Sequence, residues 1–402
     1  QVGKDPLDVR KLNFYGRDAR DLTPYQMRVE DFILDELVEE LEATSRYRQR
    51  RKEIHEYNLS SPIIRRGLAL TPVKFGISFT NTSFNQAGAL LHVYKDGSIQ
   101  LNHGGTEMGQ GLFIKVAQVV AQELQVDIDQ IEITATHTGK VPNTSATAAS
   151  SGSDLNGMAA LNAARTIRRR LTAFASSHYG VPETEIAFHS GHIQIGPRKV
   201  SFSDLVMEAY LNRVQLSATG FYRTPKIHWD PITVTGRPFY YFAYGAAVTE
   251  VAIDLLTGEN RVIAVDILHD VGRSLNPAVD AGQIEGGFIQ GMGWLTTEEL
   301  WWDTTGRLKT HAPSTYKIPT CSDRPEHFRM RIFEAGENTE ATIYRSKAVG
   351  EPPLMLALSV HQAIVDAISS VNAYRDLPQL PAPATPEAIL NAVDTLREQE
   401  AA

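Results

Sequence analysis

Cysteine is nearly absent from this chain of 402 residues, which contains Cys321 alone. One thiol excludes a disulfide within the chain. It also excludes an iron–sulfur cluster held by this chain alone, because such clusters normally take four thiolates. Low cysteine usage is consistent with a reducing compartment, and we therefore expect a cytoplasmic protein.

The sequence also lacks the features of a membrane or nucleic-acid protein. No run of about 18 apolar residues is present, which predicts no membrane-spanning helix, and the first residues show no signal-peptide pattern. The formal net charge of −8 gives no reason to expect nucleic acid as a partner. A hydrophobic content of 42% and a charged content of 21% are those of an ordinary soluble protein, long enough for two or three domains.

The N-terminal part of the chain is predicted to be helical. Thr23–Gln26 has a helix-start pattern, with Thr as the cap and Pro in the first turn. Residues 31–42 are amphipathic and residues 47–57 are highly charged, as is typical of helices packed on a neighbour. Because the chain opens on polar residues from Gln1, we expect a fragment, a processed product or a truncated piece. Its helical segment 1–65 would then continue from a part upstream.

Beyond Arg66 the hydrophobic period changes from that of helices to that of strands. Strands are predicted over 67–71, 74–80, 87–94 and 98–103, the last two joined by a tight turn at Asp96–Gly97. The stretches 87–111 and 241–293 share one layout: a strand, a turn, a second strand and a glycine-rich segment. We therefore predict an α+β fold with two related mixed sheet-and-helix units. The first unit spans 66–238, and the second spans 239–402 and ends in a helix.

The stretch Ser346–Leu354 places one carboxylate at a junction between a loop and a helix. Pro352 and Pro353 lack backbone N–H groups and are favoured in a first helical turn. Gly350 allows another group to approach the backbone closely. Glu351 is thus a candidate catalytic carboxylate, and the alternative is a first-turn Glu that only satisfies the helix dipole.

Three further segments combine small residues with the start of a helix: Gly104–Gly111, Thr147–Gly152 and Gly282–Gly293. Together they could cradle a polar, phosphate-bearing ligand. None is a dinucleotide fingerprint, and no P-loop lysine is present. A single glycine-rich loop is usually a turn or packing device, but three that carry Gln or Ser favour a large ligand.

In these motifs the chain resembles the C-terminal half of the molybdenum-binding region of the xanthine dehydrogenases and xanthine oxidases. The matching segments run in order through nearly the whole chain and are Lys74–Thr80, Asn85–Leu90, His103–Gly111, Thr147–Ser150, Gly220–Pro225, Ser314–Pro319 and Ser346–Leu354. The resemblance implies that both units have the molybdopterin-binding fold of the aldehyde oxidases and xanthine dehydrogenases.

The resemblance also implies roles for individual residues. Glu351 corresponds to the general base beside molybdenum, and the backbone of Ala149 to the group that closes on the metal. Contacts with the molybdopterin are implied for Gln110, Ala148, Ala149, Ser150, Gln283 and Gly350. Phe79 is implied to pack edge-on against a bound purine, and Thr80 to hydrogen-bond the substrate. By residue type alone, Phe79 equally suits a core strand.

The implied reaction is hydroxylation of hypoxanthine and xanthine to urate, with water as the oxygen source. Electrons would pass through iron–sulfur clusters and FAD, carried on other parts of the enzyme, to NAD or oxygen. An upstream segment of the molybdenum region would supply the opposing contacts, and we expect an oligomer. Two alternatives remain: an aldehyde oxidoreductase of the same family, and a cofactor-binding fragment that is inert when isolated.

Overall fold

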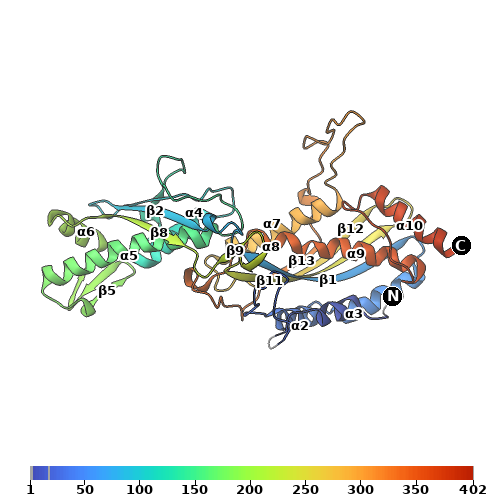
Figure 1. Cartoon of the computed structure of the whole chain (residues 1–402), viewed down its shortest axis with the longest axis horizontal. Coiled ribbons are helices and arrows are strands. Elements are labelled where there is room, and N and C mark those ends of the chain that lie inside the picture. Colours follow the sequence, from blue (N-terminus) through green and yellow to red (C-terminus); the bar gives the residue numbers. More distant parts are fainter. Residues whose placement is uncertain (1–2, 17–18, 402) are drawn as a thin grey trace.

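The computed structural model describes residues 3–16 and 19–401 and shows two α+β units at opposite ends of an elongated molecule (Figure 1). Each unit has a four-stranded sheet with helices packed against it. This architecture confirms the predicted fold class. Residues 1–2 and 17–18 of the predicted N-terminal segment lie outside the described residues.

The first unit is built on a sheet with the strand order β4-β3-β2-β8. Its main elements are β2 (Gln86–Val93), β3 (Ile99–His103), α4 (Leu112–Leu124), β4 (Ile131–Ile133), α5 (Gly152–Tyr179) and β8 (Ser217–Arg223). A smaller sheet and a helix extend from it: β5 (Ile186–His189), β6 (His192–Ile195), β7 (Arg198–Val200) and α6 (Phe202–Leu211). The helices α4 and α5 bury their apolar faces on this sheet, with Leu91, Val116 and Ile167 in the shared core.

The second unit is built on a sheet with the strand order β1-β11-β12-β13. Its elements are β1 (Ile64–Ile77), β11 (Tyr241–Asp254), β12 (Asn260–His269), α7 (Pro277–Thr296), β13 (His327–Ile332), α8 (Pro352–Leu356), α9 (Leu358–Ser369) and α10 (Pro386–Ala401). The segments beside it are α1 (Pro6–Leu12), α2 (Leu34–Thr44), α3 (Tyr47–Ser60), β9 (His228–Asp230) and β10 (Thr235–Arg237). Short 3₁₀ turns lie at Thr82–Phe84, Ile128–Gln130, Glu183–Glu185, Cys321–Asp323, Ile343–Arg345 and Ser370–Asn372.

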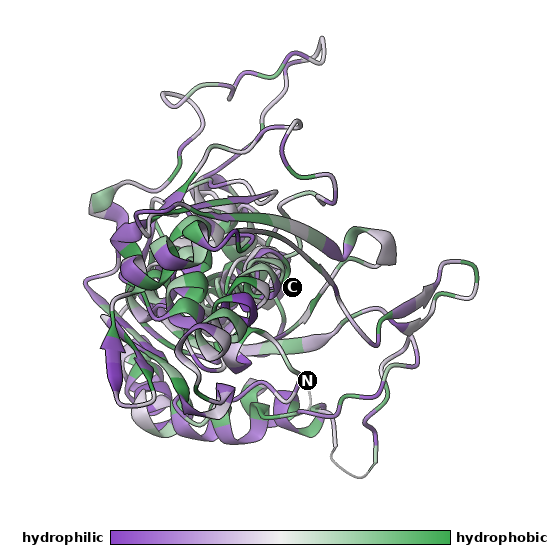
Figure 2. Cartoon of the chain, turned by 90° about the vertical axis from the view of Figure 1, so that its left-hand side faces the viewer, coloured by the Kyte–Doolittle hydropathy of each residue, from purple (hydrophilic) through white to green (hydrophobic). Residues whose placement is uncertain are grey.

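Helices cover both faces of the second sheet (Figure 1). On β11, Ala247 and Val251 face the core formed with α7 and α9, whereas Ala246 and Val248 face the core formed with α2. Successive strand residues point to opposite faces, which explains why this strand is mainly apolar on both of its sides. Helices of the molecule carry both green and purple segments in Figure 2, as expected when one side is buried and the other exposed.

The two sheets correspond strand by strand, β4 to β13, β3 to β12, β2 to β11 and β8 to β1. In each, an antiparallel hairpin leads to a helix and then to a strand parallel to the second hairpin strand. Glycines mark the same close contact in both units. A Cβ added at Gly220 in β8 would lie 1.9 Å from the Ala159 carbonyl oxygen of α5, and one at Gly67 in β1 would lie 2.0 Å from the Ala363 carbonyl oxygen of α9. This correspondence supports the predicted relation between the units.

One predicted boundary is wrong, because β1 belongs to the second sheet. The boundary at residue 66 assigned this strand to the first unit, but it pairs with β11 along its whole length, from Ile64 opposite Asp254 to Ile77 opposite Tyr241. It is also one strand of 14 residues rather than the two that were predicted. Pro72 does not interrupt it because β1 is an edge strand, where a missing N–H on the open side leaves no ladder partner unpaired.

The helices predicted over 31–42 and 47–57 correspond to α2 and α3. The predicted helix start at Thr23 is wrong, since Leu22 and Arg28 form an antiparallel bridge around a turn. Gln26 in that turn has a φ of 65°, and the Thr23 hydroxyl accepts from the Met27 N–H. The side chain therefore closes a turn instead of capping a helix, a use of Thr that competes with helix formation.

The segment Pro352–Asn372, which contains α8 and α9, is long and apolar enough to cross a membrane by length and composition. The prediction of no such segment was therefore too simple. Half of its most apolar window is buried inside the protein. Val360, Ile364 and Ile368 are fully buried against the second sheet. The segment is a core helix of the second unit.

Candidate active site

A cavity of about 350 Å³ lies where the two units meet. All three predicted loops and the Ser346–Leu354 stretch contribute to its wall. Seven predicted site residues line it: Gln110, Ala148, Ala149, Ser150, Gln283, Gly350 and Glu351. We call it the inner cavity. The fold thus gathers every residue predicted to contact the cofactor, together with the predicted base.

An open groove of about 610 Å³, which we call the outer groove, adjoins the inner cavity. Ala148, Ala149 and Glu351 lie on the walls of both. Phe79 and Thr80, the predicted substrate residues, line the outer groove. Glu351 therefore lies between the predicted cofactor residues and the predicted substrate residues.

The loop after β1 holds Phe79 through a side chain that the sequence did not single out. The buried Asn85 accepts from the Phe79 N–H at 2.8 Å and donates to the Phe79 carbonyl at 2.8 Å. The ring of Phe84 meets that of Phe79 edge-on, with 5.6 Å between centroids. The backbone position of Phe79 is therefore fixed at the end of the strand, as a binding surface requires.

The loop 104–111 is closed by Glu107, which the sequence reasoning also missed. Its carboxylate accepts from the N–H groups of Gly109 at 2.8 Å, Gly111 at 3.0 Å and Phe113 at 2.9 Å. Burial alone would raise the pKa of Glu107, but these backbone donors outweigh it and lower the pKa. Gln110 also braces the loop, since its amide donates to the Thr106 carbonyl at 2.8 Å.

The loop 147–152 is tied to the first loop and bent sharply at the cavity. The Thr147 hydroxyl accepts from the Thr106 N–H at 2.9 Å. Ala149 and Ser150 follow with φ values of 54° and 55°. Two successive non-glycine residues in the left-handed region cost free energy, and such strain is typical of functional sites. The bend brings the backbone of both residues to the cavity wall.

Glu351 is held across the junction of the units by Ser150. The Ser150 hydroxyl donates to Glu351 Oε2 at 3.0 Å and accepts from the Glu351 N–H at 2.7 Å. A Cβ at Gly350 would lie 3.0 Å from the Ser150 hydroxyl oxygen, so the glycine permits this close approach. The expected role of Gly350 in allowing close contact is therefore met by a side chain of the other unit.

Glu351 makes contacts beyond those of a residue that only precedes a helix. The residue stands directly before α8, with Pro352 in the first turn, as predicted. Its side chain makes no capping hydrogen bond to the helix. The carboxylate interacts with Ser150 and lines both cavities, and a role in satisfying the helix dipole requires neither contact.

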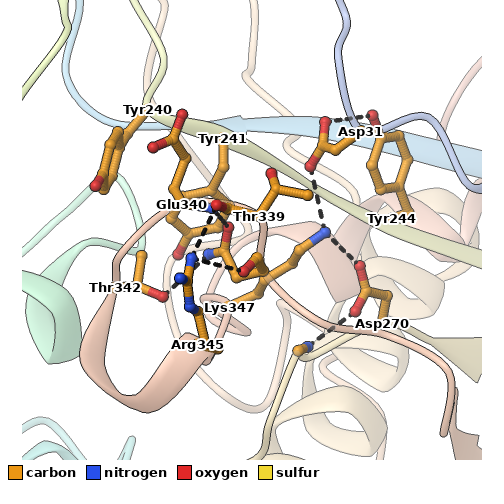
Figure 3. Close-up of polar contacts among 12 residues, drawn as sticks. Asp31, Tyr240, Tyr241, Tyr244, Asp270, Thr339, Glu340, Thr342, Arg345 and Lys347 are labelled. Atoms are coloured by element: carbon orange, nitrogen blue, oxygen red, sulfur yellow. Dashed lines mark hydrogen bonds and ion pairs between the residues drawn. The ribbon is translucent and has the colours of Figure 1, made fainter.

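The stretch that leads to Glu351 is anchored by a buried lysine (Figure 3). Lys347 Nζ lies 2.7 Å from Asp270 Oδ2 and 3.5 Å from Asp31 Oδ2. The Tyr244 hydroxyl donates to the other oxygen of Asp31 at 3.3 Å. Burial raises the pKa of Asp31, and Lys347 opposes that rise. The motif contained Lys347, but its partners come from distant parts of the chain and could not be paired from the sequence.

The floor of the inner cavity carries a second buried ion pair and an unusual carboxyl group. Lys115 Nζ lies 2.5 Å from Asp280 Oδ1, which joins α4 of the first unit to α7 of the second. The helix α5 begins at Gly152, and Asp154 lies inside its first turn. Its carboxylate accepts from the Tyr241 hydroxyl at 2.7 Å. Burial raises the pKa of Asp154 to about 7, against the effects of Tyr241 and Lys115.

The inner cavity suits the cofactor that the resemblance implies. Its volume falls within the range of about 300–1,000 Å³ that is usual for ligand pockets. Its wall offers the Gln283 amide, which both donates and accepts, and the main chain of Ala148–Ser150, while the Lys115 ammonium group on the same wall is paired with Asp280. A molybdopterin carries ring donors and ring acceptors, and the amide and main-chain groups fit them. Within residues 3–16 and 19–401, no three His, Cys, Asp or Glu side chains gather as a metal site.

Comparison with known proteins agrees with this geometry. The molybdopterin cofactor-binding domain family matches residues 40–325. The xanthine dehydrogenase/oxidase of Mus musculus is 46% identical over 391 residues, which cover 96% of this chain. That of Felis catus is 47% identical over the same length. The chain spans 28% of the length of each of these relatives.

Solved structures share the fold at lower identity. The quinoline 2-oxidoreductase of Pseudomonas putida 86 superimposes with a TM-score of 0.84 at 22% identity, over 98% of this chain and 50% of that one. The family match covers most of the chain, and the relatives match it nearly from end to end. The chain therefore belongs to the molybdopterin cofactor-binding domain family, and it corresponds to the molybdopterin-binding region of the xanthine dehydrogenase/oxidase family of oxidoreductases.

Proposed function

We propose that this chain is the molybdopterin-binding part of a cytoplasmic xanthine dehydrogenase. The complete enzyme would hydroxylate hypoxanthine and xanthine to urate, with water as the source of oxygen. The observation that carries the proposal is the position of Glu351, on the shared wall of the inner cavity and the outer groove. One cavity is lined by the residues predicted for the cofactor, and the other by those predicted for the substrate.

The molybdenum–molybdopterin group, when bound, supplies the oxygen-transfer centre and takes up two electrons from the substrate. Residues of both units would hold it in the inner cavity. Gln110 would contact the pterin from the loop before α4 and Gln283 from α7. The sharply bent backbone of Ala148–Ser150 would lie toward the metal, with Ala149 as the residue that contacts it. Gly350 leaves room for Ser150 and so for this bend.

Glu351 would act as the general base. Its Oε2 accepts the Ser150 hydroxyl at 3.0 Å, which leaves Oε1 as the atom that takes the proton released when the oxygen of water is transferred. The two hydrogen bonds with Ser150 fix both the backbone and the carboxylate of Glu351. A base held in one orientation contributes to the rate because little motion is needed to reach the reacting geometry.

Phe79 and Thr80 would orient the substrate in the outer groove. The ring of Phe79 offers an edge or face to a flat purine, and its backbone is fixed by Asn85. The hydroxyl of Thr80 would hydrogen-bond a purine nitrogen or carbonyl. Thr80 is exposed on this chain, and the upstream segment and the substrate would cover it in the complete enzyme. A hydroxyl that is buried against a polar substrate discriminates strongly against analogues that lack the partner group.

Other parts of the enzyme would complete the site and carry the electrons. The chain matches 28% of the length of its relatives, which leaves room for an upstream molybdenum-region segment and for iron–sulfur and FAD modules. The upstream segment would form the opposite wall of the outer groove. Electrons would leave through the iron–sulfur clusters and FAD to NAD or oxygen, in an enzyme that we expect to be oligomeric.

The experiment is a substrate panel on the complete enzyme in water labelled with ¹⁸O. Hypoxanthine, xanthine and several aldehydes would be compared by kcat/KM, and the products by mass spectrometry. The proposal predicts urate that carries the label, with purines turned over better than aldehydes. Turnover of aldehydes without purines would assign the chain to an aldehyde oxidoreductase instead.

A further inference from the structure

Tyr241 links the two walls of the inner cavity from behind. It is the first residue of β11, and its side chain is 2% exposed. Its hydroxyl donates to Asp154 Oδ2 at 2.7 Å and accepts from the Ala348 N–H at 2.9 Å. Asp154 and Ala348 both line the inner cavity, whereas Tyr241 lies outside its lining. One hydroxyl therefore connects two wall segments that the cavity separates.

The two segments belong to different units. Asp154 lies in the first turn of α5 in the first unit, and Ala348 belongs to the stretch of the second unit that leads to Glu351. The neighbouring residue of that stretch, Lys347, points to the ion pairs with Asp270 and Asp31 (Figure 3). The backbone of the stretch is thus held on one side by a salt bridge and on the other by the Tyr241 hydroxyl.

The chemistry of this contact suits a fixed support. Burial raises the pKa of Tyr241 well above its usual value, so the hydroxyl keeps its proton and remains the donor to Asp154. A hydroxyl that donates one hydrogen bond and accepts another is satisfied on both sides. If the Tyr241 hydroxyl is removed, the buried Ala348 N–H loses its acceptor. A buried donor without an acceptor is unfavourable, so the loop would move until this N–H finds another partner.

We propose that Tyr241, supported by Asp154, is a positioning residue that sets the place of Glu351 relative to the opposite wall of the inner cavity. It acts through the backbone at Ala348, three residues before Glu351. The inference rests on the proposed role of Glu351 as the base. It adds a residue that touches neither cavity and is needed for the geometry of both.

The test replaces Tyr241 with Phe in the complete enzyme. The ring stays in the core, and only the hydroxyl is lost. The matched control is Tyr240→Phe, because Tyr240 is the adjacent residue and equally buried, and its hydroxyl interacts with Tyr222 and the Ala341 backbone rather than with the stretch before Glu351. Hydrogen exchange of the peptide that covers 346–351 would be measured together with kcat, KM and molybdenum content.

In Tyr241→Phe we expect amide exchange in 346–351 to rise about tenfold or more, because local opening becomes easier. We expect kcat to fall by about 10- to 100-fold, with KM and molybdenum content close to those of the wild type, because a displacement of about 1 Å at a catalytic group has an effect of this size. Tyr240→Phe should change neither the amide exchange of 346–351 nor kcat. Asp154→Asn keeps an acceptor for the Tyr241 hydroxyl and should be milder than Asp154→Ala.

The outcomes separate this inference from the proposed function. Unchanged exchange in Tyr241→Phe, whatever happens to turnover, would overturn the positioning role, as would equal effects of the two Tyr variants. Faster exchange with unchanged kcat would also overturn it, because the stretch would move without consequence for the base. The kcat of Glu351→Gln would be measured in the same experiment. Because that variant leaves Tyr241 in place, its kcat tests the role of Glu351 separately from the role of Tyr241.

Discussion

Replacement of Lys347 by Met should destabilise the protein strongly. The Lys347 side chain is 1% exposed, and the side chain of its partner Asp270 is completely buried. Lys347 Nζ lies 2.7 Å from Asp270 Oδ2 and 3.5 Å from Asp31 Oδ2. Met keeps most of the volume of the lysine stem but removes the charge. The carboxylates of Asp31 and Asp270 would then lose the cation that pairs with both of them. Breaking a buried ion pair by removing one partner costs about 3–5 kcal/mol, and we expect a loss of unfolding free energy in this range.

The pH dependence gives a second readout. Burial raises the pKa of Asp31, and Lys347 is the main group that opposes this rise. Without Lys347 the pKa in the folded state rises further, so the ionised carboxylate penalises the folded state more. This penalty is present above the ordinary Asp pKa of about 3.9 and disappears as the pH falls and Asp31 takes up a proton. The deficit of Lys347→Met should therefore be smaller at pH 5 than at pH 7.5.

Urea unfolding followed by circular dichroism at these two pH values would measure the effect. The matched control is Lys309→Met, because Lys309 pairs with Asp303 at 3.1 Å and its side chain is 43% exposed. An exposed pair of this kind contributes up to about 1 kcal/mol. The reasoning is refuted if the two variants lose similar free energy, or if the deficit of Lys347→Met grows as the pH falls.

Three further predictions concern other parts of the molecule. Gly220→Ala should lower the unfolding free energy by about 1–3 kcal/mol or more in thermal melts, because the new methyl group would lie 1.9 Å from the Ala159 carbonyl oxygen. In its control, Gly286→Ala, nothing lies within 4 Å of the new methyl group, and the unfolding free energy should rise by about 0.5–1 kcal/mol. The unfolding free energy of Asp154→Asn should rise relative to that of the wild type by on the order of 4 kcal/mol between about pH 4 and pH 7. The reason is that burial raises the pKa of Asp154 to about 7, so its ionised form penalises the folded state. An equal difference between the two proteins at all pH values would contradict this prediction. Thr80→Val should lower purine kcat/KM in the complete enzyme by about 5- to 150-fold through loss of a hydrogen bond of about 1–3 kcal/mol, and unchanged purine kinetics would show that Thr80 does not contact the substrate.

Much of the site could be predicted because its chemistry is local in the sequence. The stretch 346–354 encodes its own junction, since Gly350 allows close contact and the two prolines begin a helix. Val360, Ile364 and Ile368 follow the apolar spacing of one helix face, and all three are fully buried. The end of α5 at Tyr179 is likewise local, because Gly180 follows it in the left-handed conformation.

What could not be predicted depends on contacts between distant residues. The pairing of β1 with β11 joins residues far apart in the chain, and hydrophobic period alone does not say which sheet a strand enters. The buried pair of Lys115 and Asp280 is separated by 165 positions, and nothing local marks either residue as buried. The carboxylate of Asp154 accepts from the hydroxyl of Tyr241, which is 87 positions away in the chain.

The most direct test of the central claim is the turnover of Glu351→Gln in the complete, molybdenum-loaded enzyme. Gln keeps the size and hydrogen-bonding shape of Glu but cannot accept a full proton. If Glu351 is the base, the variant should fold, bind molybdenum like the wild type, and lose kcat by about 10²–10⁴-fold or more. Near-normal kcat with a lowered melting temperature would show that Glu351 serves the structure and not the reaction.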